Sequence, residues 1–246
     1  MTTNLIYPYW PAPKHIKAVS TTRQSGFSTL PYSSFNLGTH VGDEPDIVAK
    51  NRDYLSNIAR LPESPRWLNQ VHGTHICESE NWQLNMDADA IISHHSNHVC
   101  AIMTADCLPL LLCNQQGDKV AAIHAGWHGL AAGIIEKTVA KLNCRPDEIL
   151  VWLGPAIGPS QFEVGIDVYE AFSSHSENAH RAFEQTDASH YLANIYLLAT
   201  QRLNELGISA IFGGKECTAS DNQQFFSYRR DGITGRMASL IWISDN

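Results

Sequence analysis

The sequence predicts an α/β protein in which mixed β-sheets are flanked by helices. Apolar runs of strand length are interleaved with segments whose apolar residues recur every three or four positions, and these patterns are typical of strands and amphipathic helices. The interleaving is irregular, so mixed sheets are favoured over a strict repeat of strand, helix and strand. No internal repeat, low-complexity tract or linker divides the chain, and we therefore expect a single domain over residues 1–246.

The first predicted strand, residues 16–23, runs into a long loop rich in Gly, Ser, Pro and Asn. A loop of about 20 residues inside a compact domain usually has a function of its own. The segment that follows, residues 46–61, places its apolar residues at helical spacing after Pro45. We expect an amphipathic surface helix there, with Asp46 as its N-cap.

The rest of the chain is predicted to form strands and three further helices, separated by short polar or glycine-containing turns. The predicted strands are residues 66–73, 88–95, 99–114, 119–127, 148–158, 208–214, 225–232 and 236–244. The predicted helices are residues 129–143, 165–174 and 190–206.

The composition limits the class of protein. Apolar residues make up 43% of the 246, enough for a sizeable core, and the net charge of −8 disfavours nucleic acid as a partner. No segment approaches 18 consecutive apolar residues, and the N-terminus lacks the pattern of a secretory signal. We therefore expect a cytoplasmic protein with no membrane partner; the sequence defines no oligomeric state. The six cysteines form no C-x-x-C pair, which disfavours a zinc ribbon or a disulfide framework.

Three residues stand out as candidates for chemistry: His72, Cys107 and His124. Each lies at or near the end of an apolar run and next to Gly, Asp or Pro, where sheet proteins tend to expose functional side chains. If they converge, one thiolate and two imidazoles would suit tetrahedral zinc with a fourth position open to water. Taken singly, each is also consistent with a buried, hydrogen-bonded side chain.

A second chemistry remains open for the same residues. Cys107 could itself be a nucleophile, with a thiol pKa lowered by a nearby imidazolium and His124 as the base. Asp106 precedes Cys107, but adjacent side chains of a strand point to opposite faces. The two can serve one site only if the chain turns there, and Pro109 makes such an irregularity reasonable.

Arginines are the expected anion ligands of an acidic protein. Arg23 ends a predicted strand beside the long loop, and Arg229 lies in a stretch that also holds Arg230, Asp231 and Arg236. That stretch fits either an anion site or surface ion pairs with Asp231 and other carboxylates.

Ten motifs, taken in order, resemble those of the YfiH-type family. That family has been labelled a multicopper polyphenol oxidoreductase or laccase domain. It has also been described as purine nucleoside phosphorylase with adenosine deaminase activity. The likeness runs from Thr21 to Trp242. The motifs are STTRQSGFS, FNLGTHVGDEP, NQVHG, DADA, TADCLPLLL, AAIHAGWHGLAAGII, LGPAIGP, FEVG, CT and FFSYRRDGITGRMASLIW.

The resemblance implies a zinc site on His72, Cys107 and His124. It also implies a single α/β domain similar to the catalytic domain of cytotoxic necrotising factor toxins, which use a Cys and a His. The implied reactions are phosphorolysis of adenosine, inosine, guanosine and methylthioadenosine to the base and ribose 1-phosphate, and hydrolytic deamination of adenosine.

Phosphorolysis requires a nucleoside and phosphate as small-molecule partners. We expect Arg23 and Arg229 to bind phosphate, and Asn36 and Gln70 to bind ribose hydroxyls or the base, since amides offer both donors and acceptors.

Three other functions remain open. The family also implies an amidase-like editing hydrolase that removes serine from the cell-wall precursor UDP-MurNAc-L-Ser. A copper-dependent polyphenol oxidase is disfavoured, because the chain has 12 histidines but no H-x-H pair. A binding module with purely structural zinc would need a fourth Cys or His ligand.

Overall fold

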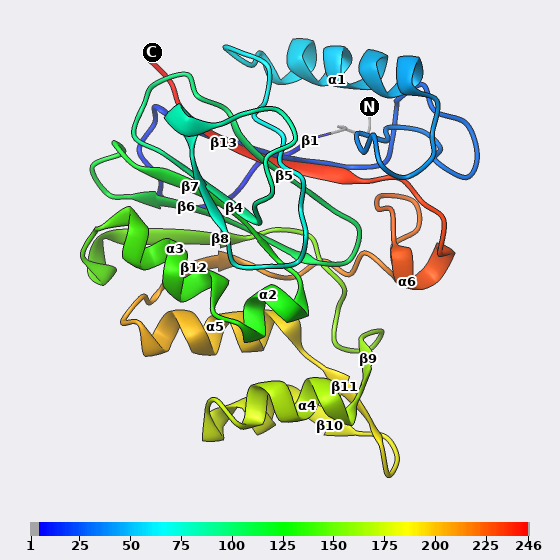
Figure 1. Ribbon diagram of the computed structural model, residues 1–246, viewed down its shortest axis with the longest axis vertical. Helices are drawn as coiled ribbons and strands as arrows, with labels where there is room; N and C mark the ends of the chain where they lie inside the picture. The colour runs from blue at the N-terminus through cyan, green and yellow to red at the C-terminus, as the bar shows by residue number, and fades with distance from the viewer. Residues whose placement is uncertain (1–4, 246) are drawn as a thin grey trace.

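The structure is a computed structural model that describes residues 5–245 and has a mixed α/β fold with three sheets (Figure 1). The largest sheet has six strands. Their spatial order is β12 (Ala210–Gly213), β8 (Ile149–Leu153), β6 (Leu108–Asn114), β7 (Val120–Ala125), β4 (Ala90–Ser93) and β3 (Ile76–Glu78).

The second sheet has four strands and the third has three. The four are, in spatial order, β1 (Leu5–Ile6), β2 (Ile16–Thr21), β13 (Met237–Ile243) and β5 (Cys100–Thr104). The three are β10 (Phe183–Gln185), β11 (His190–Ala193) and β9 (Glu163–Gly165). This arrangement of parallel and antiparallel pairs confirms the predicted mixed-sheet α/β class.

Six helices accompany the sheets within residues 5–245. They are α1 (Pro45–Ala59), α2 (Trp127–Ala131), α3 (Ile134–Leu142), α4 (Ile166–Ser173), α5 (Ile195–Glu205) and α6 (Tyr228–Asp231). Short 3-10 turns lie at Ser79–Asn81, Pro146–Glu148 and Glu177–Ala182. Within residues 5–245, no helix combines the length and the hydrophobicity that a transmembrane span requires.

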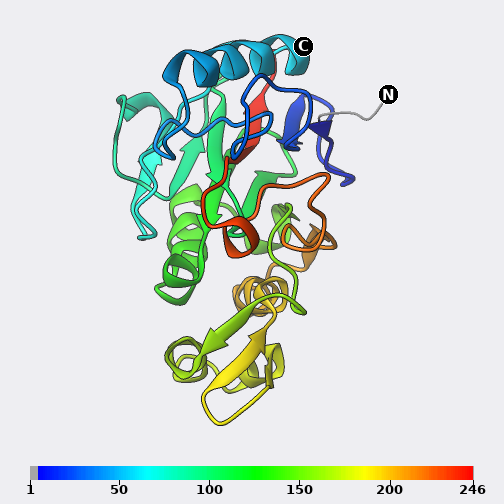
Figure 2. The ribbon, with the colours of Figure 1, turned by 90° about the vertical axis from the view of Figure 1, so that its right-hand side faces the viewer.

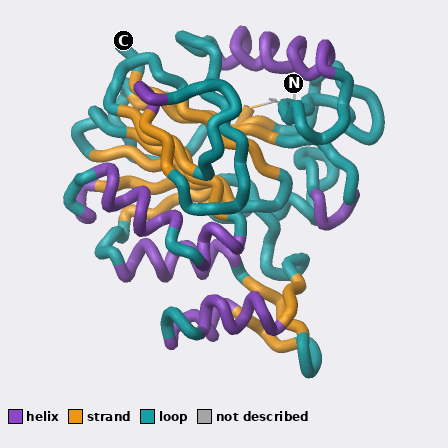
Figure 3. Tube along the Cα trace, viewed as in Figure 1, coloured by secondary structure: helices purple, strands orange, loops and turns teal. Residues whose placement is uncertain are grey.

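The two larger sheets pack face to face between outer helices, which gives four layers (Figures 1 and 3). Strand β6 shows why: Leu110 and Leu112 face the core under α3 and α5, whereas Leu111 and Cys113 face the four-stranded sheet. Because side chains alternate along a strand, an unbroken apolar run can be buried on both faces. The outer face of the four-stranded sheet packs against α1, with Leu55 fully buried there.

The chain changes sheet in the middle of the segment that was predicted as one strand, residues 99–114. It leaves the four-stranded sheet after Thr104, bends over residues 105–107, and enters the six-stranded sheet at Leu108. The turn that Asp106 and Cys107 would need in order to serve one site therefore exists, and it lies where the two sheets meet.

Three sequence-based expectations for single elements are wrong. Residues 66–73 form only isolated bridges, at Arg66 and Asn69, because their apolar side chains are too few to sustain a strand. Residues 225–232 contain helix α6 and no strand, since the Ser227 side chain accepts from the N–H of Arg230 and caps a helical turn over residues 228–231. The N-cap of α1 is Glu44 rather than Asp46, with Pro45 in the first turn.

Two predicted helices are interrupted. The segment 129–143 divides into α2 and α3 at Gly133, whose φ of 88° a helix interior excludes. The segment 190–206 begins as strand β11 and becomes helix α5 only after Asn194, whose side chain caps the helix by accepting from the N–H of Leu197. Strands β1, β3, β9 and β10, each of two or three residues, are too short for a periodicity signal.

Candidate metal centre and active site

Strand register brings the predicted functional residues to one edge of the six-stranded sheet. Pro109 of β6 pairs with His124 of β7, so Cys107 lies beside the end of β7. Ala90 of β4 pairs with Ile123, which places Asp89 beside His124. His72 comes from the loop that crosses this edge.

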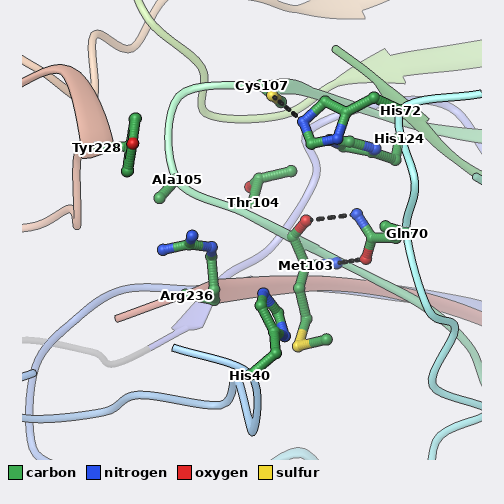
Figure 4. A pocket seen from close by; sticks show the side chains of 10 residues that line it. All are labelled: His40, Gln70, His72, Met103, Thr104, Ala105, Cys107, His124, Tyr228 and Arg236. Atoms are coloured by element: carbon green, nitrogen blue, oxygen red, sulfur yellow. Dashed lines mark hydrogen bonds between the residues drawn. The ribbon is translucent and has the colours of Figure 1, made fainter. Parts of the chain in front are cut away.

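The donor atoms of His72, Cys107 and His124 all lie within 4.8 Å of one another (Figure 4). The Sγ of Cys107 is 3.8 Å from Nε2 of His72, and the two imidazole rings meet edge to face with centroids 4.8 Å apart. The backbone at Gly126 passes close to them: a Cβ there would lie 3.0 Å from Cδ2 of His72 and 3.2 Å from the Cys107 sulfur. The three residues therefore form one cluster, which we call the His–Cys–His triad.

Asp89 holds two members of the triad in place. Its fully buried carboxylate accepts from three successive backbone N–H groups, those of Val71, His72 and Gly73, at 2.7 to 3.3 Å. These bonds stabilise His72 in a left-handed conformation with φ of 60°, which is uncommon outside glycine. The same carboxylate lies 2.8 Å from Nδ1 of His124.

The Asp89–His124 bond also sets the orientation of the imidazole. Although burial opposes ionisation of Asp89, its bonds with His124 and the backbone N–H groups lower its pKa, so it is a carboxylate that can only accept. Nδ1 of His124 must then carry the proton and donate. This leaves Nε2 directed toward the triad, as in metal sites where a carboxylate orients a ligating histidine.

Charge interactions favour the thiolate of Cys107. Burial would raise the pKa of this thiol, but the charge of His124 and the hydrogen bonds to both imidazoles lower it to about 6. Burial would lower the pKa of His124, whereas the Cys107 thiolate and Asp89 raise it to about 9. A thiolate beside an imidazolium is therefore the favoured state of the metal-free protein at neutral pH.

Asp106 holds the turn that carries Cys107. Its φ of 93° is unusual for a residue with a side chain. The carboxylate accepts from the hydroxyls of Thr218 and Ser227 at 2.6 and 3.0 Å, and from the N–H of Arg229 at 2.7 Å. Asp106 thus links the β5–β6 turn to two later segments of the chain, and its bonds are with those segments rather than with the triad.

The triad forms part of the wall of a cavity of about 470 Å³ (Figure 4). The remaining lining residues are His40, Gln70, Met103, Thr104, Ala105, Tyr228 and Arg236. No carboxylate of residues 5–245 lines this cavity, although the protein carries a net charge of −8. A smaller, mainly apolar cavity of about 200 Å³ shares Ala105, Cys107 and Tyr228 with it.

The four residues expected to bind substrate lie in different places. Gln70 lines the main cavity, where its amide bonds with the backbone N–H and C=O of Met103 at 2.7 and 2.8 Å. Arg229 lines the smaller cavity and donates to the carbonyl of Gln161.

The other two lie away from both cavities. Arg23 lines a separate, open depression and donates to the carbonyls of Ser33 and Asn222. Asn36 is fully buried, and its amide bonds within its own loop and with the N–H of Arg236. In this structure the Asn36 amide is therefore out of reach of a ligand.

Three further residues of the site were not identified from the sequence, and a fourth, Arg236, was named only as part of a stretch that fits either an anion site or ion pairs. Asp89 lies in the DADA motif, but its contact with His124 depends on the pairing of β4 with β7. His40 lies in the long loop that was expected to have a function. Tyr228 and Arg236 lie at the two ends of a stretch that also holds Arg229, Arg230 and Asp231. The charged side chains of this stretch could pair with one another, so the sequence does not show which of them line a site.

The chemistry of the donors fits a metal ion. One sulfur and two imidazole nitrogens suit zinc or copper better than magnesium or calcium, which prefer oxygen. In a tetrahedral zinc site with bonds of about 2.3 Å to sulfur and about 2.1 Å to nitrogen, the sulfur and the nitrogen lie about 3.6 Å apart. The distance between Cys107 Sγ and His72 Nε2 is close to this, at 3.8 Å. No other group within residues 5–245 brings three such donors together.

Known proteins resemble this chain in sequence and in fold over nearly its whole length. "Purine nucleoside phosphorylase YfiH" of Escherichia coli is 52% identical over 242 residues, which cover 98% of this chain and 99% of that protein. "Purine nucleoside phosphorylase" of Haemophilus influenzae is 50% identical over 240 residues, covering 96% and 98%. The crystal structure of a Neisseria meningitidis protein, 45% identical, has a TM-score of 0.95 and covers 98% of this chain and 100% of that one.

A more distant structure and a family match agree with these relatives. YlmD from Geobacillus stearothermophilus, 27% identical, has a TM-score of 0.93, and the match covers 100% of this chain and 98% of that one. The family described as multi-copper polyphenol oxidoreductase laccase matches residues 17–244. This chain therefore belongs to the YfiH-type, laccase-like family, whose members include proteins named purine nucleoside phosphorylase.

Proposed function

We propose that this chain is a zinc-dependent purine nucleoside phosphorylase that also deaminates adenosine to inosine. The observation that carries the proposal is the convergence of a thiolate and two imidazoles on a cavity, in a chain whose relatives bear the phosphorylase name. The substrates are adenosine, inosine, guanosine and methylthioadenosine, each with phosphate. The products are the free base and the ribose 1-phosphate.

The two adjoining cavities suit the two parts of a nucleoside. Trp127, Ile157, Phe162 and Ile195 give the smaller cavity apolar walls, against which a planar purine can pack. The larger cavity is lined by polar groups, including Gln70 and Thr104, and we place the ribose there. Cys107 lies where the two cavities join, so the glycosidic bond would lie close to the triad.

Phosphorolysis is mainly a problem of position. An oxygen of phosphate bonds to the anomeric carbon while the bond from that carbon to the base nitrogen breaks, and the base departs with the electron pair and takes up a proton. The protein contributes by holding phosphate and nucleoside in line and by stabilising the charge of the departing base. When bound by His72, Cys107 and His124, zinc would supply Lewis-acid chemistry at this wall of the cavity.

Deamination needs water in place of phosphate. Water adds to C6 of adenosine, and ammonia leaves. Both reactions use the same nucleoside in the same cavity, so removal of phosphate should favour inosine over adenine as the product from adenosine.

Metal analysis together with product analysis tests the proposal. Purified protein is expected to contain about one zinc per chain, to convert adenosine and phosphate to adenine and ribose 1-phosphate, and to form inosine without phosphate. Cys107→Ala should abolish metal binding and both reactions. Cys144→Ala is the matched control, because the Cys144 thiol bonds the carbonyl of Leu142 and lies outside both cavities.

Three outcomes would contradict the proposal. Unchanged turnover in Cys107→Ala would remove the thiolate from the reaction. Release of serine from UDP-MurNAc-L-Ser, with no cleavage of nucleosides, would identify the editing hydrolase instead. Copper in the purified protein together with oxidation of polyphenols would support the oxidase.

A further inference from the structure

Among the described residues, Arg236 is the one arginine that lines the main cavity, and part of its guanidinium makes no hydrogen bond with them. NH1 donates to the backbone carbonyls of Thr234 and Gly235 at 3.0 and 3.1 Å, while no described residue bonds with Nε or NH2. Figure 4 shows the guanidinium of Arg236 and the ring of His40 on one side of the cavity, with the triad on the other. Two donor groups of this arginine, Nε and NH2, therefore have no acceptor among residues 5–245.

The surroundings of Arg236 favour an anion. No carboxylate of the described residues lines the cavity. The negative groups close enough to act on Arg236 are the thiolate of Cys107, which belongs to the triad, and Asp106, which already accepts from Thr218, Ser227 and the backbone. Burial, and then the positive charges of Arg236 and Arg52, lower the pKa of His40 below its ordinary value. A neutral imidazole still offers one N–H donor. The cavity thus pairs a fixed positive charge with a second donor.

The arginine is also held in place. Its aliphatic stem packs over the backbone of Gly38, where a Cβ would lie 2.9 Å from Cγ of Arg236. The backbone N–H of Arg236 donates to the side chain of Asn36 at 2.9 Å. An arginine held in this way loses little further freedom when it binds a ligand, and its planar fork matches two oxygens of a phosphate group.

We propose that Arg236 and His40 form the anion subsite of this cavity and that the subsite holds inorganic phosphate, across the cavity from the His–Cys–His triad. The assignment to free phosphate rests on the proposed phosphorolysis. The subsite takes the role that was expected of Arg23, because Arg23 lies in a separate depression. Arg229 lies beside the apolar cavity, and its guanidinium donates to the carbonyl of Gln161.

Titration of purified protein with inorganic phosphate, without nucleoside and at constant ionic strength, tests the subsite by calorimetry. Arg236→Met should weaken phosphate binding by at least about tenfold, because a charge-assisted pair of hydrogen bonds is lost. Arg236→Lys should lose less affinity for phosphate than Arg236→Met, because lysine keeps the positive charge although it lacks the planar pair of donors. His40→Phe, at an exposed position with little risk to folding, should also weaken binding.

Arg181→Met, the same change at an exposed arginine, should bind phosphate as the wild type does. The subsite would be overturned by wild-type affinity in both Arg236→Met and His40→Phe. The subsite would also be overturned if Arg229→Met weakened phosphate binding by about tenfold while the Arg236 and His40 variants kept the wild-type affinity. Wild-type protein that binds uridine diphosphate but not inorganic phosphate would overturn the assignment to free phosphate.

Turnover separates this inference from the proposed function. Phosphate binding that depends on Arg236, in a protein that cleaves no nucleoside, would uphold the subsite and reject the phosphorylase. Nucleoside cleavage with an unchanged KM for phosphate in Arg236→Met would support the phosphorylase and reject the subsite.

Discussion

At the scale of single residues, one carboxylate organises the candidate metal centre. Asp89 accepts from the backbone of the loop that carries His72 and from the ring of His124, so two of the three triad members depend on it. Such supporting partners of metal ligands set both ring orientation and basicity.

We expect Asp89→Asn to weaken metal binding by about 10- to 100-fold. The neutral amide accepts less strongly from His124 and can instead donate to Nδ1, which would orient the wrong tautomer of the ring. Competition with a chromogenic chelator measures the change. Asp187→Asn, in an exposed turn, is the control; equal metal affinity in Asp89→Asn and wild type would contradict this role.

The thiol of Cys107 gives a second prediction at this scale. Because its pKa in the metal-free protein is lowered to about 6, the reactive thiolate increases as pH rises through 6 and is nearly complete at pH 7.5. The rate of alkylation by iodoacetamide, followed by mass spectrometry of the Cys107 peptide, should show that midpoint. In His124→Asn the midpoint should move upward. A wild-type midpoint near that of an ordinary thiol would contradict the charge pairing.

The sequence identified the triad but not its support. Taken singly, His72, Cys107 and His124 each also fit a buried, hydrogen-bonded side chain, but the resemblance to the family implies them as a set. Asp89 could not be assigned, because a carboxylate beside a strand has many possible partners. Arg236 was passed over for Arg23 and Arg229 because the sequence does not show which guanidinium groups are already bonded to the backbone.

At the scale of elements, the bend between β5 and β6 determines the position of the sulfur. Residues 105–107 connect two different sheets, and Asp106 joins this bend to Thr218 and to the first turn of α6. A periodic apolar pattern cannot reveal such a change of sheet, because the residues on both sides are equally buried.

Asp106→Ala should lower the free energy of unfolding by about 2–4 kcal/mol, because two hydroxyls and one helix N–H lose an ionised acceptor. Urea denaturation followed by circular dichroism measures this. Asp106→Asn keeps one carbonyl acceptor and should cost less than the alanine variant. An alanine variant as stable as the wild type would show that water replaces the carboxylate without loss.

Other elements show where sequence patterns succeed and fail. The unbroken apolar runs of β6 and β13 predicted buried strands correctly. Helix α6 was missed because its two aromatic neighbours, Phe225 and Phe226, mimic a strand, while the helix itself depends on a cap from Ser227. Gly133 interrupts a helical pattern through its backbone conformation, which apolar spacing does not encode.

At the scale of the whole molecule, the site lies where the chain passes between the two larger sheets. The triad combines a loop, the bend between two sheets and the end of β7, so its geometry depends on contacts distant in the sequence. The irregular interleaving of strands and helices was enough to predict the mixed sheets, but not how they stack, since apolar strands do not show which faces meet.

Removal of the metal should therefore destabilise the whole fold. A ligand present at about 1,000 times its Kd stabilises the native state by about 4 kcal/mol, which for a chain of this size raises Tm by roughly 8–16 °C. Differential scanning calorimetry before and after treatment with a chelator measures the difference. Cys107→Ser should show no such difference; an unchanged Tm in the chelated wild type would mean that the site binds metal weakly.

The three-stranded sheet and α4 project from the body of the molecule, away from the larger sheets (Figure 2). At the far end, the hairpin between β10 and β11 turns through exposed residues 186–189. A fluorophore, an affinity handle or a bead could be attached at that tip while the cavity stays open to solvent. The protein can thus be immobilised in one orientation for single-molecule or flow measurements.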